Sequence, residues 1–498
     1  MSTLIGIQTL IITVIILLLT ASWRLYQKRK YYRGVTSKLP TLYGIPFIGV
    51  AYEMLDVNKI FHNMSMGFDK INALTGCIWV ATTPYVLSVD PEVIKHVVSS
   101  PEFLNKATDE YTHFQNGLFN GLIVTPAKQW KADRKIISPF FAHNNIVAFF
   151  PAFNGNAISL KNKLERLTGQ GEQHIFTIIK ECGLQLSLLT IMDLKVEECS
   201  DTYREIMQAF NNFIDHMGKD FLYGWFGLAF LSRTPHYNRV RKYLKDLVQS
   251  LTKTHLALQL ESNATSNIVE DKQPMIDITV KALRQGLFSE KQVVVEGFTM
   301  LAASYETSVG AVYTCLLMLA MHPEIQERVF QEIRSVFPNG VITVEYEDLK
   351  KLPYLDMFVL EALRLAPPVP FIGRKTFQDS ELCPGVILPK GARIIISIYE
   401  LHRRKEIWGT DSSRFNPDNF LPENIAKRHP YSYMPFSKGS RNCIGFRYVE
   451  ISLRIILIHA VRSFKFSTTF KYEDIVHVPH ISLHYKIEPP LSIEVRAN

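Results

Sequence analysis

The stretch Phe436-Ser437-Lys438-Gly439-Ser440-Arg441-Asn442-Cys443-Ile444-Gly445 is the most informative part of this 498-residue chain. An apolar stretch from Phe446 to Phe464 follows it and predicts a helix. Cys443 would then stand at a helix N-terminus, where free backbone N–H groups favour a thiolate and lower its pKa. The two glycines allow the backbone to turn tightly and to approach a flat ligand closely. The alternative is a buried, inert cysteine in a turn.

The pattern Phe-x-x-Gly-x-Arg-x-Cys-x-Gly resembles the haem-binding loop of the cytochromes P450. The resemblance implies haem b with its iron bound by the Cys443 thiolate. It places Phe436, Gly439, Arg441 and Gly445 in the same site, with Arg441 bonded to a cofactor carboxylate. It also implies a mainly α fold with a small β portion, as a single triangular globule behind an N-terminal membrane anchor helix.

A second motif lies in a long apolar helix, predicted from the capping box Ser289-x-x-Gln292 to Met321. Its stretch Ala303–Ser308 resembles the oxygen-activating motif of the family, which implies proton delivery through Glu306 and Thr307. Thr307 would bond to the carbonyl one turn back. Ser304 replaces the usual glycine, and would narrow the space for oxygen or add a hydrogen bond. Without the resemblance, Thr307 is a core threonine and Glu306 a buried acid that needs a partner.

The same helix has two interpretations, because Thr299–Met321 contains one charged residue, Glu306, and is long enough to span a membrane. The stretch lacks basic flanks, and an acid at its middle is costly in lipid. A helix buried through the centre of a large globule is therefore the favoured interpretation.

Further motifs complete the resemblance. Glu361 and Arg364 lie at i,i+3 on one helix face, which alone is typical of a solvated surface pair. The resemblance assigns them to a structural network behind the haem loop, in which Asn419 stands where the family often has an arginine. The network should therefore be weaker or differently wired. Trp130 and Arg134, at i,i+4, and Arg374 would contact the haem propionates.

Three runs resemble clan 4 of the microsomal enzymes, particularly its insect members: Trp130 to Phe141, His322 to Gln326 and Phe415 to Asn424. Some enzymes of that clan carry a glutamate that esterifies the haem, and Ala303 stands at its place. We therefore expect a porphyrin held non-covalently. Expected pocket residues are Phe114, Leu118, Phe119, the helix around Ala302, Val369–Phe371 and Ile481–Leu483.

The N-terminus predicts a membrane anchor. Leu4–Ala21 is uncharged and, at 1.5 Å per residue, about 27 Å long, close to the thickness of a bilayer core. Basic residues follow it, from Arg24 to Arg33, which places the C-terminal side in the cytoplasm. A cleaved secretory signal is the alternative, but such signals carry basic residues before the apolar stretch, and residues 1–3 have none. The predicted division is an anchor at 1–23, a basic, proline-containing hinge at 24–46 and a catalytic domain at 47–498.

The remaining composition limits the partners. The net charge of +8 is spread along the chain, without the aromatic and basic pattern of a nucleic-acid binder. The six cysteines form no zinc motif or disulfide framework, which indicates a reducing compartment. The resemblance implies the endoplasmic reticulum membrane, a cytosolic catalytic domain, membrane lipid as a contact, and NADPH-cytochrome P450 reductase and cytochrome b5 as partners. Basic residues that would form an electropositive docking face are Lys128, Lys131, Lys135, Lys438 and Arg447.

Periodicity predicts the other elements. Helices are expected near 128–143, 173–195, 201–219, 236–261 and 275–285, and strands near 370–376, 385–398 and 464–494. Residues 70–93 predict one β-hairpin, and Gly385–Ile396 predicts a second, closed by Pro389-Lys390-Gly391.

The resemblance implies a monooxygenase that inserts one oxygen atom of dioxygen into a lipophilic substrate, such as a fatty acid, a terpenoid or hormone, or a xenobiotic. Two alternatives remain. One is a haem-thiolate isomerase or lyase acting on peroxides, which would tolerate loss of the acid and threonine. The other is a haem-binding sensor without enzymatic activity, favoured only by Ser304 and Asn419.

Overall fold

The computed structural model describes residues 2–107, 111, 120–197, 200–225, 231, 233–262, 272–338 and 342–496. Its chain divides into two compact units. The first unit comprises residues 1–107 and 373–397, and the second comprises 108–372 and 398–498. Helices predominate and the sheets are small, so the prediction of a mainly α fold is confirmed.

The first unit is built on a five-stranded sheet of order β1-β2-β3-β8-β5. Its helices are α1 (Ser2–Tyr31), α2 (Arg33–Thr36), α3 (Ile60–Ile71) and α4 (Pro91–Ser99). Its strands are β1 (Thr41–Leu42), β2 (Thr75–Val80), β3 (Thr83–Ser88), β6 (Ser380–Cys383), β7 (Val386–Leu388) and β8 (Arg393–Ser397), while β5 (Phe371–Lys375) runs across the point where the chain passes between units. The expected hairpin at 70–93 is present as the antiparallel pair β2–β3.

The second predicted hairpin, at Gly385–Ile396, is wrong. β7 pairs with β6, while β8 pairs in parallel with β3, with Val86 opposite Ile394. The turn at 389–391 therefore separates two strands that belong to different sheets. The physical reason is burial: β8 is almost continuously apolar and buried, which suits a central strand with neighbours on both sides.

Helix α1 is long and apolar enough over Ile5–Tyr31 to span a membrane. Its most apolar part has a mean hydropathy of 2.3 and is not buried against the rest of the protein. The helix continues without a break through the basic residues at its C-terminal end. Lys28 Nζ then donates to Thr83 Oγ1 at 3.4 Å, and β1 pairs with β2. Part of the stretch predicted as a hinge is thus integrated into the first unit.

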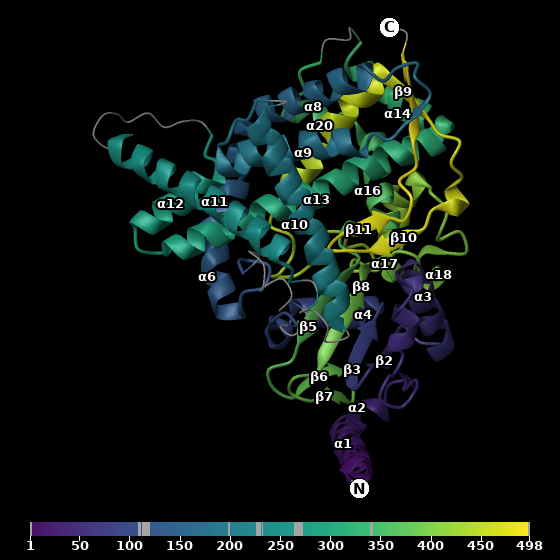
Figure 1. The fold of residues 1–498 in the computed structure, drawn as a ribbon. Coiled ribbons are helices and arrows are strands. Elements are labelled where there is room, and N and C mark those ends of the chain that lie inside the picture. Colours follow the sequence, from purple (N-terminus) through teal and green to yellow (C-terminus); the bar gives the residue numbers. More distant parts are fainter. Residues whose placement is uncertain are drawn as a thin grey trace. The chain divides into compact units, whose positions relative to one another are not determined.

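The second unit surrounds one buried helix, α13 (Glu290–Met321), which contacts α9 (Phe176–Met192) and α20 (Phe446–Ser463) (Figure 1). The Ser289 capping box begins α13, and His322-Pro323 ends it, both as predicted. Most of its side chains are buried, as the interpretation as a central helix requires. The remaining helices include α6 (Ala127–Ile137), α7 (His143–Ala148), α8 (Phe150–Glu165), α10 (Asp201–Trp225), α11 (Pro235–Ser262), α12 (Met275–Arg284), α14 (Pro323–Val336), α15 (Tyr346–Leu349), α16 (Pro353–Leu365), α17 (Ile398–Leu401), α18 (Lys405–Trp408) and α19 (Pro422–Ala426).

Small sheets complete the second unit. One has the order β4-β12-β9, and the other is the antiparallel hairpin β10-β11. Their strands are β4 (Glu172–Gln173), β9 (Phe464–Ser467), β10 (His477–Pro479), β11 (Leu483–Tyr485) and β12 (Leu491–Val495). The helix predicted over 128–143 is shorter than expected, because a 3-10 helix with Pro139 in its first turn, Ser138–Phe141, follows Ile137.

Candidate haem site

The loop that carries Cys443 closes on itself through backbone hydrogen bonds. The Cys443 N–H donates to Phe436 O at 2.9 Å, and the Asn442 N–H donates to Gly439 O at 3.1 Å. Ser437 and Gly439 both have left-handed φ angles, of 59° and 74°. The glycine at 439 is thus explained by backbone conformation, as predicted.

Gly445 has a different reason to be glycine. Its φ is −92°, which any residue adopts. A Cβ atom there would lie 3.3 Å from Cε1 of Phe141, so a larger residue would require the phenyl ring to shift by a few tenths of an ångström. Gly445 is also the N-cap of α20, so Cys443 lies two residues before the N-cap, at the helix N-terminus as predicted.

Cys443 is exposed to solvent as a residue, although burial by the surrounding protein is the largest cause of the shift in the pKa of its thiol. Burial raises the pKa of Cys443, and this outweighs the lowering by the Gly445 N–H and by Arg134. The lowering of the pKa expected from the helix N-terminus is present, but burial outweighs it for the free thiol. Thiolate formation at this position therefore gains from a bound metal ion.

Two guanidinium groups and an indole ring lie beside this loop. Arg134 donates from Nη1 to Asn442 O at 2.8 Å and from Nη2 to Asn442 Oδ1 at 2.6 Å. Arg441 Nη2 donates to Thr125 O at 2.7 Å. The Trp130 ring centroid lies 4.4 Å from Cζ of Arg441 and 5.5 Å from Cζ of Arg134. The structure thus brings together three of the four residues expected to contact haem propionates.

Arg374, the fourth residue, belongs to the first unit. Its side chain is buried and donates from Nη1 to Gly373 O at 2.9 Å. Its part in the haem site stays a prediction.

The residues present fit a haem group. Cys443 is exposed, and its thiolate would be a soft ligand for iron. The guanidinium groups of Arg134 and Arg441 can bind carboxylates. In addition, Thr125 Oγ1 and Ser437 Oγ are buried without a hydrogen-bond partner among the described residues, and polar groups of this kind usually have one.

On α13, Thr307 Oγ1 donates to Ala303 O at 2.8 Å, which is the predicted bond one turn back. Glu306 is buried, and its Oε1 accepts from Ser482 Oγ and from His484 Nε2, both at 2.7 Å. Burial raises the pKa of Glu306, but hydrogen bonds from His484 and Ser482 with the charges of the neighbouring histidines outweigh it and lower the pKa. Glu306 therefore has the partners that a buried acid needs, and sequence reasoning missed them.

Ser304 donates to or accepts from Ser187 on α9, with 3.0 Å between the hydroxyl oxygens. Tyr448 on α20 also bonds to Ser304, and its hydroxyl lies 2.9 Å from that of Thr190. Of the two expectations for the serine, an added hydrogen bond and a narrower oxygen space, the structure contains the hydrogen bond.

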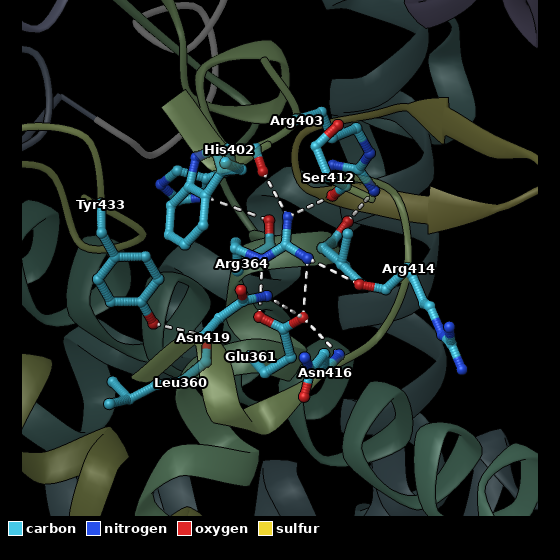
Figure 2. A network of polar contacts seen from close by, with 12 residues as sticks. Leu360, Glu361, Arg364, His402, Arg403, Ser412, Arg414, Asn416, Asn419 and Tyr433 are labelled. Atoms are coloured by element: carbon cyan, nitrogen blue, oxygen red, sulfur yellow. Dashed lines mark hydrogen bonds and ion pairs between the residues drawn. The ribbon is translucent and has the colours of Figure 1, made fainter. Parts of the chain in front are cut away.

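The network around Glu361 and Arg364 is completely buried (Figure 2). Arg364 donates from Nε to Glu361 Oε2 at 2.6 Å and from Nη2 to Oε1 at 2.7 Å. Its other contacts are the carbonyl oxygens of His402, Ser412 and Arg414, at 2.7, 2.6 and 3.0 Å. The interpretation as a solvated surface pair is therefore excluded.

The network reaches the segment that leads into the haem loop. His402 Nδ1 lies 3.1 Å from Arg364 O, and the Met434 N–H donates to His402 Nε2 at 2.9 Å. Tyr433 donates to Leu360 O at 2.9 Å (Figure 2). The buried ion pair thus holds the chain just before Phe436.

Asn419, for which we expected weaker or different contacts in this network, lies in the 3-10 helix Pro417–Phe420. Asn419 Nδ2 donates to Glu361 Oε1 at 3.1 Å, and Arg428 donates to the carbonyl oxygen of Asn419. Cζ of Arg428 also lies 4.2 Å from the Trp408 ring centroid. The positive charge that Asn419 lacks is thus supplied nearby by Arg428, which sequence reasoning did not single out.

The expected pocket residues are covered only in part. Phe114, Leu118 and Phe119 lie outside the described residues. Ala302 is buried. The range Ile481–Leu483 contains Ser482, which donates a hydrogen bond to Glu306. Lys128, Lys131, Lys135 and Arg447 are exposed.

Comparison with known proteins identifies the family. The family described as Cytochrome P450 matches residues 39–486. "Probable cytochrome P450 313a4" of Drosophila melanogaster is 33% identical over 479 residues, covering 95% of this chain and 96% of the relative. "Cytochrome P450 4c21" of Blattella germanica is 29% identical over 466 residues, covering 90% of this chain and 91% of the relative. The chain belongs to the cytochrome P450 family, the haem-thiolate monooxygenases.

Proposed function

We propose that this monooxygenase inserts oxygen into a lipophilic substrate with electrons from NADPH, delivered by NADPH-cytochrome P450 reductase. The observation that carries the proposal is the pairing of a Thr307 hydroxyl bonded to Ala303 O with a Glu306 carboxylate bonded to His484 and Ser482. A haem bound through Cys443 would supply the redox chemistry and the activation of dioxygen.

The role proposed for Glu306 and Thr307 is proton transfer. Neighbouring hydrogen bonds lower the pKa of Glu306, so the carboxylate is ionised at neutral pH and accepts protons from His484 or from solvent. Thr307 would pass on a proton from its hydroxyl and regain one from the Glu306 carboxyl group, so that the hydroxyl is unchanged after each transfer. An isomerase acting on peroxides would not need this pair.

The residues proposed to hold the cofactor are those around the Cys443 loop. Arg134 and Arg441 would bind its carboxylates beside Trp130, together with Arg374, and Gly439, Gly445 and Phe436 would shape the loop. The porphyrin is proposed to be non-covalent, because Ala303 offers no carboxyl group. Glu361, Arg364 and Asn419 are proposed to support the loop without taking part in chemistry.

The reductase is proposed to dock on the basic residues near the haem loop. Exposed lysines on α6, among them Lys128 and Lys131, and Arg447 at the start of α20 would attract an acidic flavoprotein and speed its association. Cytochrome b5 would compete for the same basic residues.

The proposed location is the endoplasmic reticulum membrane. Helix α1 is apolar and exposed over the length of a bilayer, and Lys28, Arg29 and Lys30 stand in its last turn. This asymmetry favours a catalytic domain on the cytosolic side. Lipophilic substrates, whether fatty acids, terpenoids or hormones, or xenobiotics, would reach such an enzyme from the membrane.

The proposal is tested by turnover under heavy-isotope dioxygen. The purified protein, NADPH, the reductase and a panel of fatty acids, terpenoids and insecticides would be incubated together, and products analysed by mass spectrometry. One labelled oxygen atom per product is expected, with loss of labelling in Cys443→Ala and a large decrease in Thr307→Ala. The matched control is Thr252→Ala, because Thr252 Oγ1 makes the same bond to the carbonyl four residues back, at 2.8 Å to Val248 O, on another helix.

Equal labelling in Thr307→Ala and Thr252→Ala would contradict the role of Thr307. Rearrangement of a peroxide substrate without NADPH, in the absence of any labelled product, would support an isomerase instead.

A further inference from the structure

Glu306 belongs to a cluster of three side chains of the kinds that bind metal ions. Glu306, on α13, lies with His480 and His484, and one potential metal-ligand atom from each residue is within 4.8 Å of the other two. His480 follows β10, and His484 lies on β11, so both histidines come from one hairpin. The centroids of their rings are 4.7 Å apart.

Each of the two imidazoles has a nitrogen suited to coordination. His484 Nε2 lies 2.7 Å from Glu306 Oε1, so a single proton joins the two ligand atoms. His480 Nδ1 is buried and has no hydrogen-bond partner among the described residues. A buried polar nitrogen without a partner is rare and destabilising, and a metal bond would satisfy it.

The protonation state favours coordination, because a histidine must be neutral to bind a metal. Burial and the charge of His484 lower the pKa of His480 to about 4, so His480 is neutral at physiological pH. The other charges that act on it are those of Glu306, Asp215 on α10 and Lys180 on α9. A cation bound here would therefore be near the carboxylates of Glu306 and Asp215 and the ammonium group of Lys180.

The side chains can also be reached and held. The His484 side chain is 24% exposed, so a hydrated ion has access to one ligand. His480 packs against Gly218 on α10, where a Cβ atom would lie 1.8 Å from its Nε2. This contact fixes the ring, and rigid ligands lose little conformational freedom on binding a metal.

We propose that Glu306, His480 and His484 form a binding site for a divalent transition-metal cation of the zinc type. Two imidazoles and one carboxylate suit such cations, and leave further positions for water. Binding displaces the proton between His484 Nε2 and Glu306 Oε1, and the neutral His484 ring then carries its proton on Nδ1. Because the cation would occupy Glu306, it would also inhibit proton delivery, and that consequence rests on the proposed function, whereas the binding itself does not.

The test is calorimetric titration of the purified haem-containing protein, freed of metal by a chelator, with zinc chloride. One zinc ion per chain is expected, with affinity lowered at least about tenfold in His480→Ala and in His484→Gln, since even residues that only support metal ligands contribute 10–100-fold. The matched control is His174→Gln, which alters an exposed histidine and should bind zinc normally. Magnesium chloride should give no binding, because that ion prefers oxygen ligands.

The proposal fails if zinc does not bind, or if both cluster variants bind it as tightly as the unaltered protein. Haem absorption and thermal unfolding of each variant would show that it is folded. Titration needs neither substrate nor reductase, so failure of the proposed monooxygenase reaction would leave the zinc result unchanged.

Discussion

Replacing Arg364 with alanine should destabilise the protein more than any exposed arginine substitution. Arg364 and Glu361 have no exposed side-chain surface, so the substitution leaves a buried carboxylate without its ion-pair partner. It also leaves the carbonyl oxygens of His402, Ser412 and Arg414 without this donor (Figure 2).

The magnitude follows from these contacts. Removing one partner of a buried ion pair typically costs about 3–5 kcal/mol. Burial already raises the pKa of Glu361 with Arg364 beside it, so the orphaned carboxyl group would take up a proton and limit the loss. We expect a decrease of about 3–5 kcal/mol in the free energy of unfolding, a large part of the roughly 5–15 kcal/mol of a typical protein.

The assay is urea unfolding followed by tryptophan fluorescence, with Trp408 close to the network, and by haem absorption. The matched control is Arg204→Ala, which removes an exposed i,i+3 ion pair with Asp201 and should cost about 0.2–1 kcal/mol. Equal unfolding midpoints for the two variants would refute the reasoning.

Other substitutions and conditions test separate parts of the structure. Ser304→Gly removes the hydrogen bond to Ser187 and adds a glycine to a helix, so we expect about 1–2 kcal/mol less stability in thermal unfolding; a more stable variant would contradict the role of this bond. Burial lowers the pKa of His459 from 6.5 to about 4. Between these two pH values the unfolded chain binds more protons at this residue than the folded chain does, so the free energy of unfolding decreases as the pH falls. His459→Gln should therefore reduce the change in urea midpoint between pH 6.5 and 5, and an unchanged difference would contradict this. Arg441→Ala should lower haem retention in gel filtration more than Lys131→Ala, because Arg441 contacts Trp130 beside the haem loop while Lys131 is exposed.

Local features of the site could be predicted from the sequence. The Cys443 loop, the Thr307 hydrogen bond and the Glu361–Arg364 pair join residues that are close along the chain, where backbone geometry fixes which side chains meet. The ends of α13 also followed from local signals, the Ser289 capping box and Pro323.

Contacts between distant segments could not be predicted in the same way. β8 prefers β3 to the adjacent β7, and this choice depends on burial of the whole sheet. His484 reaches Glu306 across 178 positions, and the only signal was the alternation of polar residues at His480, Ser482 and His484. The net pKa of Cys443 was missed because the helix end acts locally, while burial depends on the complete fold.

The central claim, that Cys443 is the iron ligand of a haem-thiolate enzyme, is tested most directly by the absorption spectrum of the reduced carbon monoxide complex. The unaltered protein and Cys383→Ser, which changes another free cysteine, should both give the thiolate-type spectrum. Cys443→His should bind haem with an imidazole-type spectrum instead. A thiolate-type spectrum that persists in Cys443→His, or disappears in Cys383→Ser, would contradict the account.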